Sequence, residues 1–522
     1  MKTAYKILLS VLSGILVLFS FPTVLFGWHA PDLAIIAWFA LVPLFVATYK
    51  SSPRESFALT FIASLVWYGG SVYWVYNAMF NYGGLSFFTS ILIAMLMIII
   101  LSLYISVVPC LAKWVNRRFR GELIVLLPAI WVSVELCRNY IPCNGFPWAN
   151  IAMSQYSLLP IIQIVDITGV YGLIFLIVFV NEFVAEFIIR LSGEKVQFFK
   201  QKAIVTFIIL CAVVAYGFYK LDRIPKSVET GGTVKVGLIQ GNIDQGEKWA
   251  EEKVRYNLDI YSSGTKELSQ APVDLIIWPE ASYPWSLADN LKSLPPRNLG
   301  ISENKKNTNP YLIIGAVTED ADQYMYNSAL LFDVNGRVAG IYHKTHLAPF
   351  GEYVPYKKLF FFARKLTVHV GDFIEGESFL PLSFGNHKTG ILICYEDIFP
   401  EISRKQVNNG AEFLATITND AWFGKTSAPY QHLALSVFRA VENRRYLVRS
   451  ANTGITAIIS PIGRIITESN IFERSMVVSS VFPSDIITTY TFLGDWFAWA
   501  CVAYTIFMLS LAVKRKKLKT KN

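Results

Sequence analysis

The sequence has 522 residues, of which 53% are hydrophobic and only 16% are charged. The mean hydropathy is +0.41, which excludes an ordinary soluble globular protein and predicts a membrane protein. The formal net charge is +9, and its distribution along the chain decides what it means.

Eight apolar stretches are long enough to be membrane spans, since crossing a bilayer takes about 20 mostly apolar residues. The first follows Lys2 and Lys6 as a secretion signal would, but it lacks a small-residue cleavage site and further spans follow, so we expect it to be retained. The predicted spans are residues 7–27, 32–49, 56–78, 88–112, 122–138, 165–189, 203–219 and 489–513.

Basic residues occupy alternate connections, which sets the predicted orientation, because Lys and Arg are retained on the cytoplasmic side. The other short connections carry none after the first and third spans and only Arg138 after the fifth. Both termini are therefore predicted to be cytoplasmic, and the positive charge indicates topology rather than a nucleic-acid partner. The basic residues that are predicted to lie on the cytoplasmic side are Lys2, Lys6, Lys50, Arg54, Lys113, Arg117, Arg118, Arg120, Arg190, Lys195, Lys200, Lys202 and those of the tail 514–521.

Three regions follow from this topology: a membrane domain of seven helices at 1–220, a domain on the non-cytoplasmic side at 221–488, and a last helix with a basic tail at 489–522. The middle region is long enough for one α/β domain. Short apolar runs that stop at polar residues are typical of buried strands, and helical spacing lies between them at 249–269, 398–409 and 427–446. The predicted strands lie in 234–243, 273–282, 310–319, 390–397 and 412–424.

Residues 326–347 split at Asn335-Gly336, a strong signal for a two-residue hairpin. The second strand of this hairpin ends at His343, Lys344 and His346. The two histidines have no evident third ligand, so we expect no metal there and a shaping role beside Lys344. The segment 450–469 repeats the hairpin pattern.

Cys394, in the run GILICYEDIF, is the one cysteine of the middle region. A disulfide framework needs an even number of cysteines, so this region does not use one. A lone cysteine is often a small buried hydrophobe. However, a strand that ends at Cys394 and turns into Tyr395, Glu396 and Asp397 places the thiol beside charge at a sheet edge, where nucleophiles lie.

Such a nucleophile needs a base and a cation, and two other predicted strands end in suitable residues. Glu280 follows Trp278-Pro279, where partial burial would raise its pKa toward the range of a general base. Lys344 would stabilise a thiolate and an oxyanion. Alone, Glu280 reads as a turn carboxylate and Lys344 as a solvated lysine, but the ordered set of three strand ends predicts catalysis.

The motifs IIWPEAS, YHKTHLAPFGEYVP and LICYEDIFP carry this set, and together they resemble the nitrilase, or carbon-nitrogen hydrolase, superfamily. The resemblance assigns the catalytic triad to Glu280, Lys344 and Cys394. Seven spans, such a domain and a final span resemble the apolipoprotein N-acyltransferase family within it. Gln240-Gly241-Asn242 and the run from Asn419 to Gly424 fit the same family.

The resemblance implies an αββα sandwich on the outer face of a bacterial inner membrane and a reaction without a cofactor. Cys394 would take an acyl group from a phospholipid, typically phosphatidylethanolamine, as a thioester. The N-terminal amine of a diacylglyceryl-cysteine apolipoprotein would then accept it. Glu280 would move the protons, and Lys344 would hold the oxyanion.

Supporting residues are expected around the triad. By family analogy Glu352 orients Lys344, and Tyr395 and Glu396 line the pocket; Asn419 belongs to the second family run. Trp249 and Arg439 are candidate substrate contacts, with a core aromatic and a structural ion-pair partner as the alternatives.

Two further features bear on the membrane. The stretch Tyr356 to Leu366 mixes phenylalanines with cations, as an interfacial lid would, and the alternative is a buried helix or strand with a solvated basic edge. Polar residues within the spans are costly in lipid and are expected to face the helix bundle interior. They include Glu135, Asp166, Asn181 and Glu182.

Two other functions remain open from the residues. A membrane-anchored amidase acting on a small extracytoplasmic amide would use the same triad, but eight spans exceed what anchoring needs. A transporter or scaffold with a domain that only binds would have no reason to keep all three triad residues.

Overall fold

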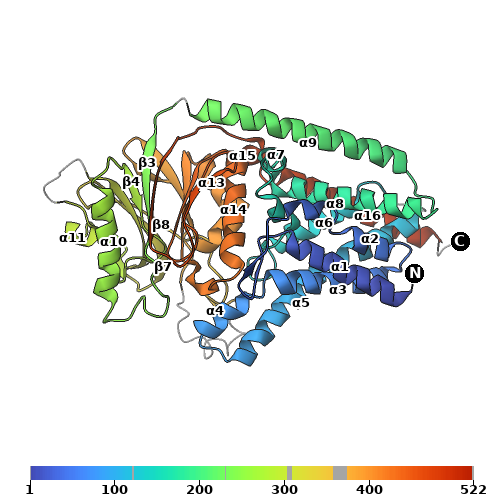
Figure 1. Ribbon diagram of the computed structural model, residues 1–522, viewed down its shortest axis with the longest axis horizontal. Helices are drawn as coiled ribbons and strands as arrows, with labels where there is room; N and C mark the ends of the chain where they lie inside the picture. Colours follow the sequence, from blue (N-terminus) through green and yellow to red (C-terminus); the bar gives the residue numbers. More distant parts are fainter. Residues whose placement is uncertain (1, 120–122, 230, 303–308, 357–372, 520–522) are drawn as a thin grey trace. The chain divides into compact units, whose positions relative to one another are not determined.

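A computed structural model describes residues 2–119, 123–229, 231–302, 309–356 and 373–519, which form two compact units (Figure 1). The first unit holds Met1–Tyr76, Ile91–Leu221 and Leu493–Asn522, and the second holds Asn77–Ser90 and Asp222–Phe492. The chief difference from the predicted boundaries is Asn77–Ser90, which includes the connection between two predicted spans and the adjoining end of each. It packs within the second unit because Asn77 Nδ2 donates to the Trp422 carbonyl at 3.1 Å and the Tyr82 ring lies edge-on to the Trp422 ring at 5.4 Å.

The first unit is helical, and every predicted apolar stretch contains a helix. By length and composition, four described helices can cross a membrane, or five if α3 and α4 (Val75–Asn81), bent by 50°, form one span. α1 has 17 residues and α6 has 13, so the count of eight spans stays a prediction. The main helices are α1 (Thr3–Phe19), α2 (Val42–Thr48), α3 (Pro53–Ser71), α5 (Phe87–Phe119), α6 (Leu126–Arg138), α7 (Leu159–Ile162), α8 (Val165–Leu191), α9 (Phe199–Val228) and α16 (Trp496–Lys519).

The predicted second span is broken rather than continuous, with a 3-10 turn at Ala34–Trp38 before α2. Asn181 of α8 replaces the backbone hydrogen bonds lost at the break. Its Oδ1 accepts from the Leu41 amide at 2.8 Å, and its Nδ2 donates to the Ala37 carbonyl at 2.8 Å. An apolar stretch tolerates such a break because a buried side chain satisfies the freed backbone groups.

The expectation that polar span residues face the interior is confirmed for Glu135, Asp166 and Asn181, whereas Glu182 is partly buried. Glu135 and Asp166 are each 3% exposed, and Asn181 is fully buried. Each carboxylate has a partner from its own unit: Glu135 pairs with Arg138 at 2.6 Å, and Asp166 accepts from the Tyr216 hydroxyl at 2.7 Å. Glu182 pairs with Lys202 at 2.9 Å.

The second unit contains two sheets, and the predicted strands and the hairpin around Asn335-Gly336 are confirmed, although the connection has five residues, 333–337, instead of two. The seven-stranded sheet has the order β15-β3-β4-β6-β7-β8, with β5 paired to β6, and the six-stranded sheet has the order β14-β13-β12-β11-β10-β9. The strands β3, β4 and β6 are parallel, as are β10, β11 and β12. Strand bounds are β3 Val234–Gln240, β4 Leu275–Ile277, β5 Leu287–Ala288, β6 Tyr311–Glu319, β7 Met325–Phe332, β8 Val338–His343, β9 Leu382–Phe384, β10 His387–Ile393, β11 Phe413–Thr418, β12 Leu447–Ala451, β13 Ala457–Ile459, β14 Ile465–Glu468 and β15 Ser475–Val481.

Helices cover both outer faces, which confirms the αββα sandwich. α10 (Val254–Leu268) lies on the seven-stranded sheet, and α13 (Pro400–Asn408) and α14 (Ala428–Asn443) lie on the six-stranded sheet (Figure 1). The sheets are joined face to face by Ser450 of β12, whose hydroxyl contacts the carbonyl of Ile239 at 3.2 Å and that of Ile277 at 3.1 Å. The carboxyl-terminal ends of β3, β4 and β12 are thereby held together.

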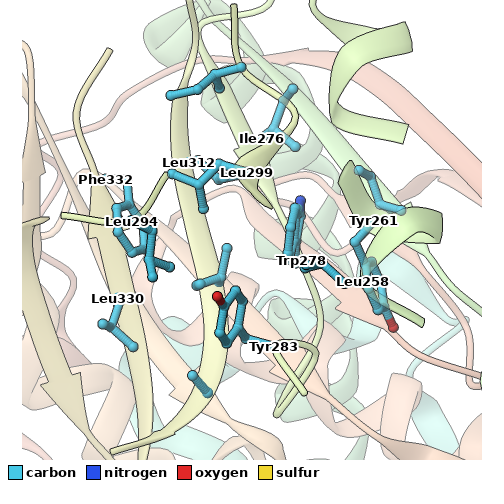
Figure 2. Close-up of a cluster of buried hydrophobic side chains, with 14 of the residues drawn as sticks. Leu258, Tyr261, Ile276, Trp278, Tyr283, Leu294, Leu299, Leu312, Leu330 and Phe332 are labelled. Carbon is cyan, nitrogen blue, oxygen red and sulfur yellow. The ribbon is translucent and has the colours of Figure 1, made fainter. Parts of the chain in front are cut away.

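The core between α10 and the first sheet is centred on Trp278 (Figure 2). Its ring stacks on Tyr261 at 5.2 Å, and its Nε1 donates to Thr265 Oγ1 at 2.8 Å. Trp278 is fully buried and lies two residues before Glu280. Packing of this ring therefore fixes the chain that leads from β4 to the predicted base.

Replacing this ring should destabilise the second unit. We expect Trp278→Ala to lower its free energy of unfolding by about 3–5 kcal/mol, because the cavity lies in a closed core. Hydrogen exchange of the β3 and β4 amides in detergent measures the effect. Trp285→Ala, at a residue 40% exposed, is the control and should cost under about 1.5 kcal/mol; equal losses would contradict the assignment of the core.

Candidate active site

Three strand ends meet in the second unit and bring the predicted triad together. Glu280 lies three residues after β4, and Lys344 and Cys394 immediately follow β8 and β10. Glu280 and Lys344 therefore come from the seven-stranded sheet and Cys394 from the six-stranded one. Glu280 is 7% and Lys344 1% exposed, whereas Cys394 is partly exposed.

The carboxylates are held by a cluster of hydrogen bonds around Lys344. Its Nζ lies 2.8 Å from Glu352 Oε2 and 3.8 Å from Glu280 Oε1. Asn327 Nδ2 bridges the same two carboxylates, at 2.8 Å from Glu280 and 2.7 Å from Glu352. The backbone N–H of Asn419 donates to the second carboxylate oxygen of Glu280 at 2.9 Å. Glu352 thus lies where the resemblance places it, beside the lysine.

Burial and charge oppose each other at Lys344. Burial alone lowers the pKa of this ammonium, but the charges of Glu352 and Glu280 and a hydrogen bond from Glu352 raise it above its ordinary value. Lys344 is therefore a permanent cation. A permanent cation can stabilise an oxyanion but cannot serve as a general base.

The thiol has the opposite balance. Burial and the charge of Glu280 raise the pKa of Cys394 well above its ordinary value, and Lys344 only partly offsets them. Cys394 is therefore a thiol at rest, and it needs a neighbouring base to become a nucleophile. Its backbone has φ +50°, a left-handed conformation that costs a non-glycine residue roughly 1–2 kcal/mol.

Glu396 occupies a different position from the pocket-lining one expected. Its carboxylate is fully buried and accepts hydrogen bonds from Tyr342, Thr345 and the Ile393 amide at 2.7–2.9 Å. Burial raises the pKa of Glu396 to about 7. Glu396 thus ties the end of β8, which carries Lys344, to the turn that carries Cys394.

Arg439 is likewise enclosed, so the ion-pair alternative describes its position. Nε and Nη2 pair with Glu442 at 2.7 and 2.8 Å, and Nη1 donates to the carbonyls of Asp397 and Ile398 at 3.2 Å. The side chain is 1% exposed. It supports the turn after Cys394 and has no free face for a substrate.

The remaining predicted supporting residues differ in exposure. Trp249 is 44% exposed, and Tyr395 is partly exposed with its ring edge-on to Phe399. Asn419 is buried, and its Oδ1 accepts from Asn452 at 3.0 Å. The stretch from Tyr356 to Leu366 lies outside the described residues after Tyr356.

Lys248 and Asn327 belong to the site but are not among the predicted residues. Lys248 is 3% exposed, and its Nζ donates to the Glu280 carbonyl at 3.0 Å. Burial lowers the pKa of Lys248 to about 8, although the charges of Glu280 and Cys394 raise it. The position of Lys248 next to Trp249 is the sequence feature that could have pointed to Lys248. Asn327 has no such feature, because in the sequence it looks like an ordinary polar residue of a strand.

Known proteins match both units. A family model described as carbon-nitrogen hydrolase matches residues 235–490, and this is the class that the sandwich and the Glu-Lys-Cys cluster define. A model described as the apolipoprotein N-acyltransferase N-terminal domain matches residues 13–183.

Whole-chain relatives narrow the class. An apolipoprotein N-acyltransferase of Geobacter metallireducens is 39% identical over 98% of this chain and 96% of its own, and one of Rickettsia typhi is 35% identical over 79% and 80%. The chain belongs to the apolipoprotein N-acyltransferase family. Among solved structures, Saccharomyces cerevisiae Nit3, of branch 10 of the nitrilase superfamily, is 19% identical over 48% of this chain and 90% of its own, with a TM-score of 0.36.

The positive charge of Lys248 should affect the rate of acylation only at pH values where this side chain is protonated. At pH 7 we expect Lys248→Met to slow acylation of Cys394 about tenfold, because a nearby cation favours the thiolate. Above pH 8 wild-type Lys248 loses its proton, so the ratio of the two rates should fall toward one. Quenched-flow intact mass spectrometry from pH 6 to 9.5 measures both rates, with Lys248→Arg as the control that keeps its charge throughout. A ratio independent of pH would rule out the electrostatic role.

Proposed function

We propose that the chain transfers an acyl group from a phospholipid, through a thioester on Cys394, to the N-terminal amine of diacylglyceryl-cysteine in apolipoproteins. The observation that carries this proposal is the cluster of Glu280, Lys344 and Glu352 beside the Cys394 thiol, in a chain whose relatives are named apolipoprotein N-acyltransferase. Phosphatidylethanolamine is the proposed donor.

In the first half-reaction Glu280 takes the thiol proton while Cys394 Sγ attacks the carbonyl carbon of the donor ester. Lys344 donates to the oxyanion that forms. When the intermediate collapses, the ester C–O bond breaks, and the leaving alkoxide of the lysophospholipid takes the proton from Glu280. The acyl group stays on Cys394.

In the second half-reaction the neutral amine of the apolipoprotein attacks the thioester. Glu280 takes a proton from the attacking nitrogen, and Lys344 again holds the oxyanion. Collapse breaks the C–S bond, and the sulfur recovers its proton from Glu280. The products are an amide and the resting thiol, so no cofactor is consumed.

The proposed location is a bacterial inner membrane with eight spans, both termini in the cytoplasm and the second unit on the periplasmic side. The distribution of Lys and Arg in the short connections supports this orientation. The N-terminal family match at 13–183 supports acyl transfer over the amidase alternative, since anchoring alone does not need a domain of that kind.

Intact mass spectrometry tests the reaction in two steps. Incubated with phosphatidylethanolamine alone, the wild-type protein should gain one acyl mass, and Cys394→Ala should gain none. Glu280→Gln should acylate at least about 100-fold more slowly, because the thiol keeps its proton without the base. A diacylglyceryl-cysteine peptide added next should discharge the wild-type adduct and gain the acyl group on its amine.

Other outcomes would reject the proposal. Absence of any adduct on folded wild-type protein would point to a small-amide hydrolase or a binding domain. An adduct that decays to free fatty acid at the same rate with and without the peptide would mean a lipid hydrolase. Glu352→Gln is a control in which a smaller loss of acylation rate is expected, because glutamine keeps the size of the side chain that contacts Lys344.

A further inference from the structure

Cys394 adopts its left-handed conformation at the point where β10 ends and a 3-10 turn, Cys394–Ile398, begins. A strained residue persists only where its surroundings hold it, and such strain is found at active sites. The carbonyl of Cys394 is part of this turn. The contact made to that carbonyl is therefore a means of fixing the sulfur.

His432 of α14 makes this contact. Its Nε2 lies 3.3 Å from the Cys394 carbonyl oxygen, and the side chain is 1% exposed. A carbonyl oxygen only accepts hydrogen bonds, so Nε2 must carry the hydrogen. Both the neutral Nε2–H tautomer and the imidazolium satisfy this condition, and the contact does not depend on which of them is present.

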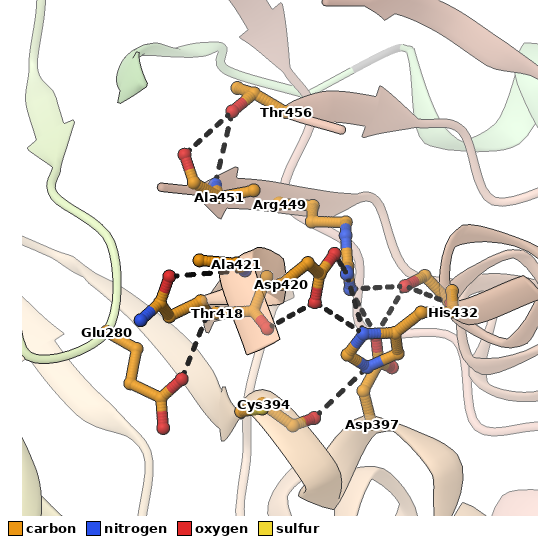
Figure 3. Close-up of polar contacts among 12 residues, drawn as sticks. Glu280, Cys394, Asp397, Thr418, Asp420, Ala421, His432, Arg449, Ala451 and Thr456 are labelled. Atoms are coloured by element: carbon orange, nitrogen blue, oxygen red, sulfur yellow. Dashed lines mark hydrogen bonds and ion pairs between the residues drawn. The ribbon is translucent and has the colours of Figure 1, made fainter. Parts of the chain in front are cut away.

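The other ring nitrogen, Nδ1, is held by two charged side chains. Nδ1 lies 3.0 Å from Asp420 Oδ1 and 2.8 Å from Arg449 Nη2 (Figure 3). Burial raises the pKa of Asp420, but Arg449 and His432 outweigh it and lower that pKa below its ordinary value, so Asp420 stays a carboxylate. The imidazole is thus held in one orientation, with Nε2 directed at the nucleophile's backbone.

Arg449 joins the two turns that build the site. Its Nη2 donates to Asp420 at 2.8 Å in the turn after β11, and its Nη1 lies 3.1 Å from Asp397 in the turn after β10. Ser436 of α14 donates to the same Asp397 oxygen. The backbone N–H of Asn419, next to Asp420, donates to Glu280. One buried network therefore reaches both the nucleophile and the base.

We propose that His432 is a positioning residue for acyl transfer: its Nε2–H holds the Cys394 carbonyl and keeps the thiol aimed at the reacting carbon. Asp420, Arg449 and Asp397 form the support that orients its ring. The inference rests on the proposed role of Cys394 as nucleophile. His432 contacts the backbone of Cys394 and acts through it.

Two substitutions of His432 distinguish the contact made by Nε2 from the contacts made by Nδ1. The amide nitrogen of glutamine reaches the place of Nε2, whereas that of the shorter asparagine reaches only the place of Nδ1. We expect His432→Asn to slow acylation from phosphatidylethanolamine about tenfold or more, because the bond to Cys394 is lost, and His432→Gln to stay within about threefold of wild type. The donor concentration at half-maximal rate should not change in either variant.

Single-turnover acylation, followed by intact mass spectrometry at several donor concentrations, measures rate and half-saturation, and thermal midpoints report folding. Equal rates for His432→Asn and wild type would overturn the inference. Equal losses in both variants with lowered midpoints would also overturn it, in favour of a structural histidine. If His432→Asn does not fold, Ser436→Ala decides, with an acylation rate reduced about threefold expected and an unchanged rate overturning the inference.

Cys394→Ala in the same assay distinguishes failure of the inference from failure of the proposed function. An adduct on Cys394→Ala would remove Cys394 as the nucleophile, whatever His432 does. Loss of the adduct in Cys394→Ala together with unchanged kinetics in folded His432→Asn would leave the proposed function standing and remove only the role of His432.

Discussion

The ammonium of Lys344, buried where the strand ends meet, is the constraint on which the site depends. An unpaired buried cation costs several kcal/mol, so its position requires carboxylates at contact distance. Glu352 at 2.8 Å and Glu280 at 3.8 Å provide them, and Asn327 keeps both carboxylates in place. The uneven distances are consistent with separate roles: Glu352 holds the lysine, and Glu280 stays available to the thiol.

The site also depends on how the two sheets of the second unit pack. Glu280 and Lys344, the proposed base and the oxyanion-binding cation, come from one sheet, and Cys394, the proposed nucleophile, comes from the other, so their separation is set by contacts between sheets. Ser450 of β12 bonds to the carbonyls of Ile239 and Ile277, near the ends of β3 and β4, and Asn452 bonds to Ile243 and Asn419. These contacts bind the strand ends of both sheets to each other. A polar link at this place fixes register as apolar packing alone does not, because hydrogen bonds are directional.

Sequence patterns could predict the residues that end strands, because a buried strand is an apolar run and the polar residue that stops it is visible. Glu280, Lys344 and Cys394 were predicted in this way, and the structure places all three at or near strand ends; the resemblance supplied Glu352, which contacts Lys344. Arg449 and His432 could not be found, since each lies inside an apolar strand or helix and its partners are 12 to 52 residues away. The broken helix at 34–48 escaped for a similar reason, because Asn181 repairs it from another helix.

The high pKa of Cys394 has opposite effects on the two halves of the proposed reaction. At rest it keeps the sulfur a thiol, which resists oxidation, and residues 222–492 hold no second cysteine with which to form a disulfide. Once Glu280 removes the proton, a thiolate of high pKa is a stronger nucleophile, but it is also a slower leaving group. The second half-reaction must expel this same sulfur. Lys344 and Lys248, the two cations beside it, lower that cost, as does the proton that Glu280 returns. The same charges therefore assist both formation and cleavage of the thioester.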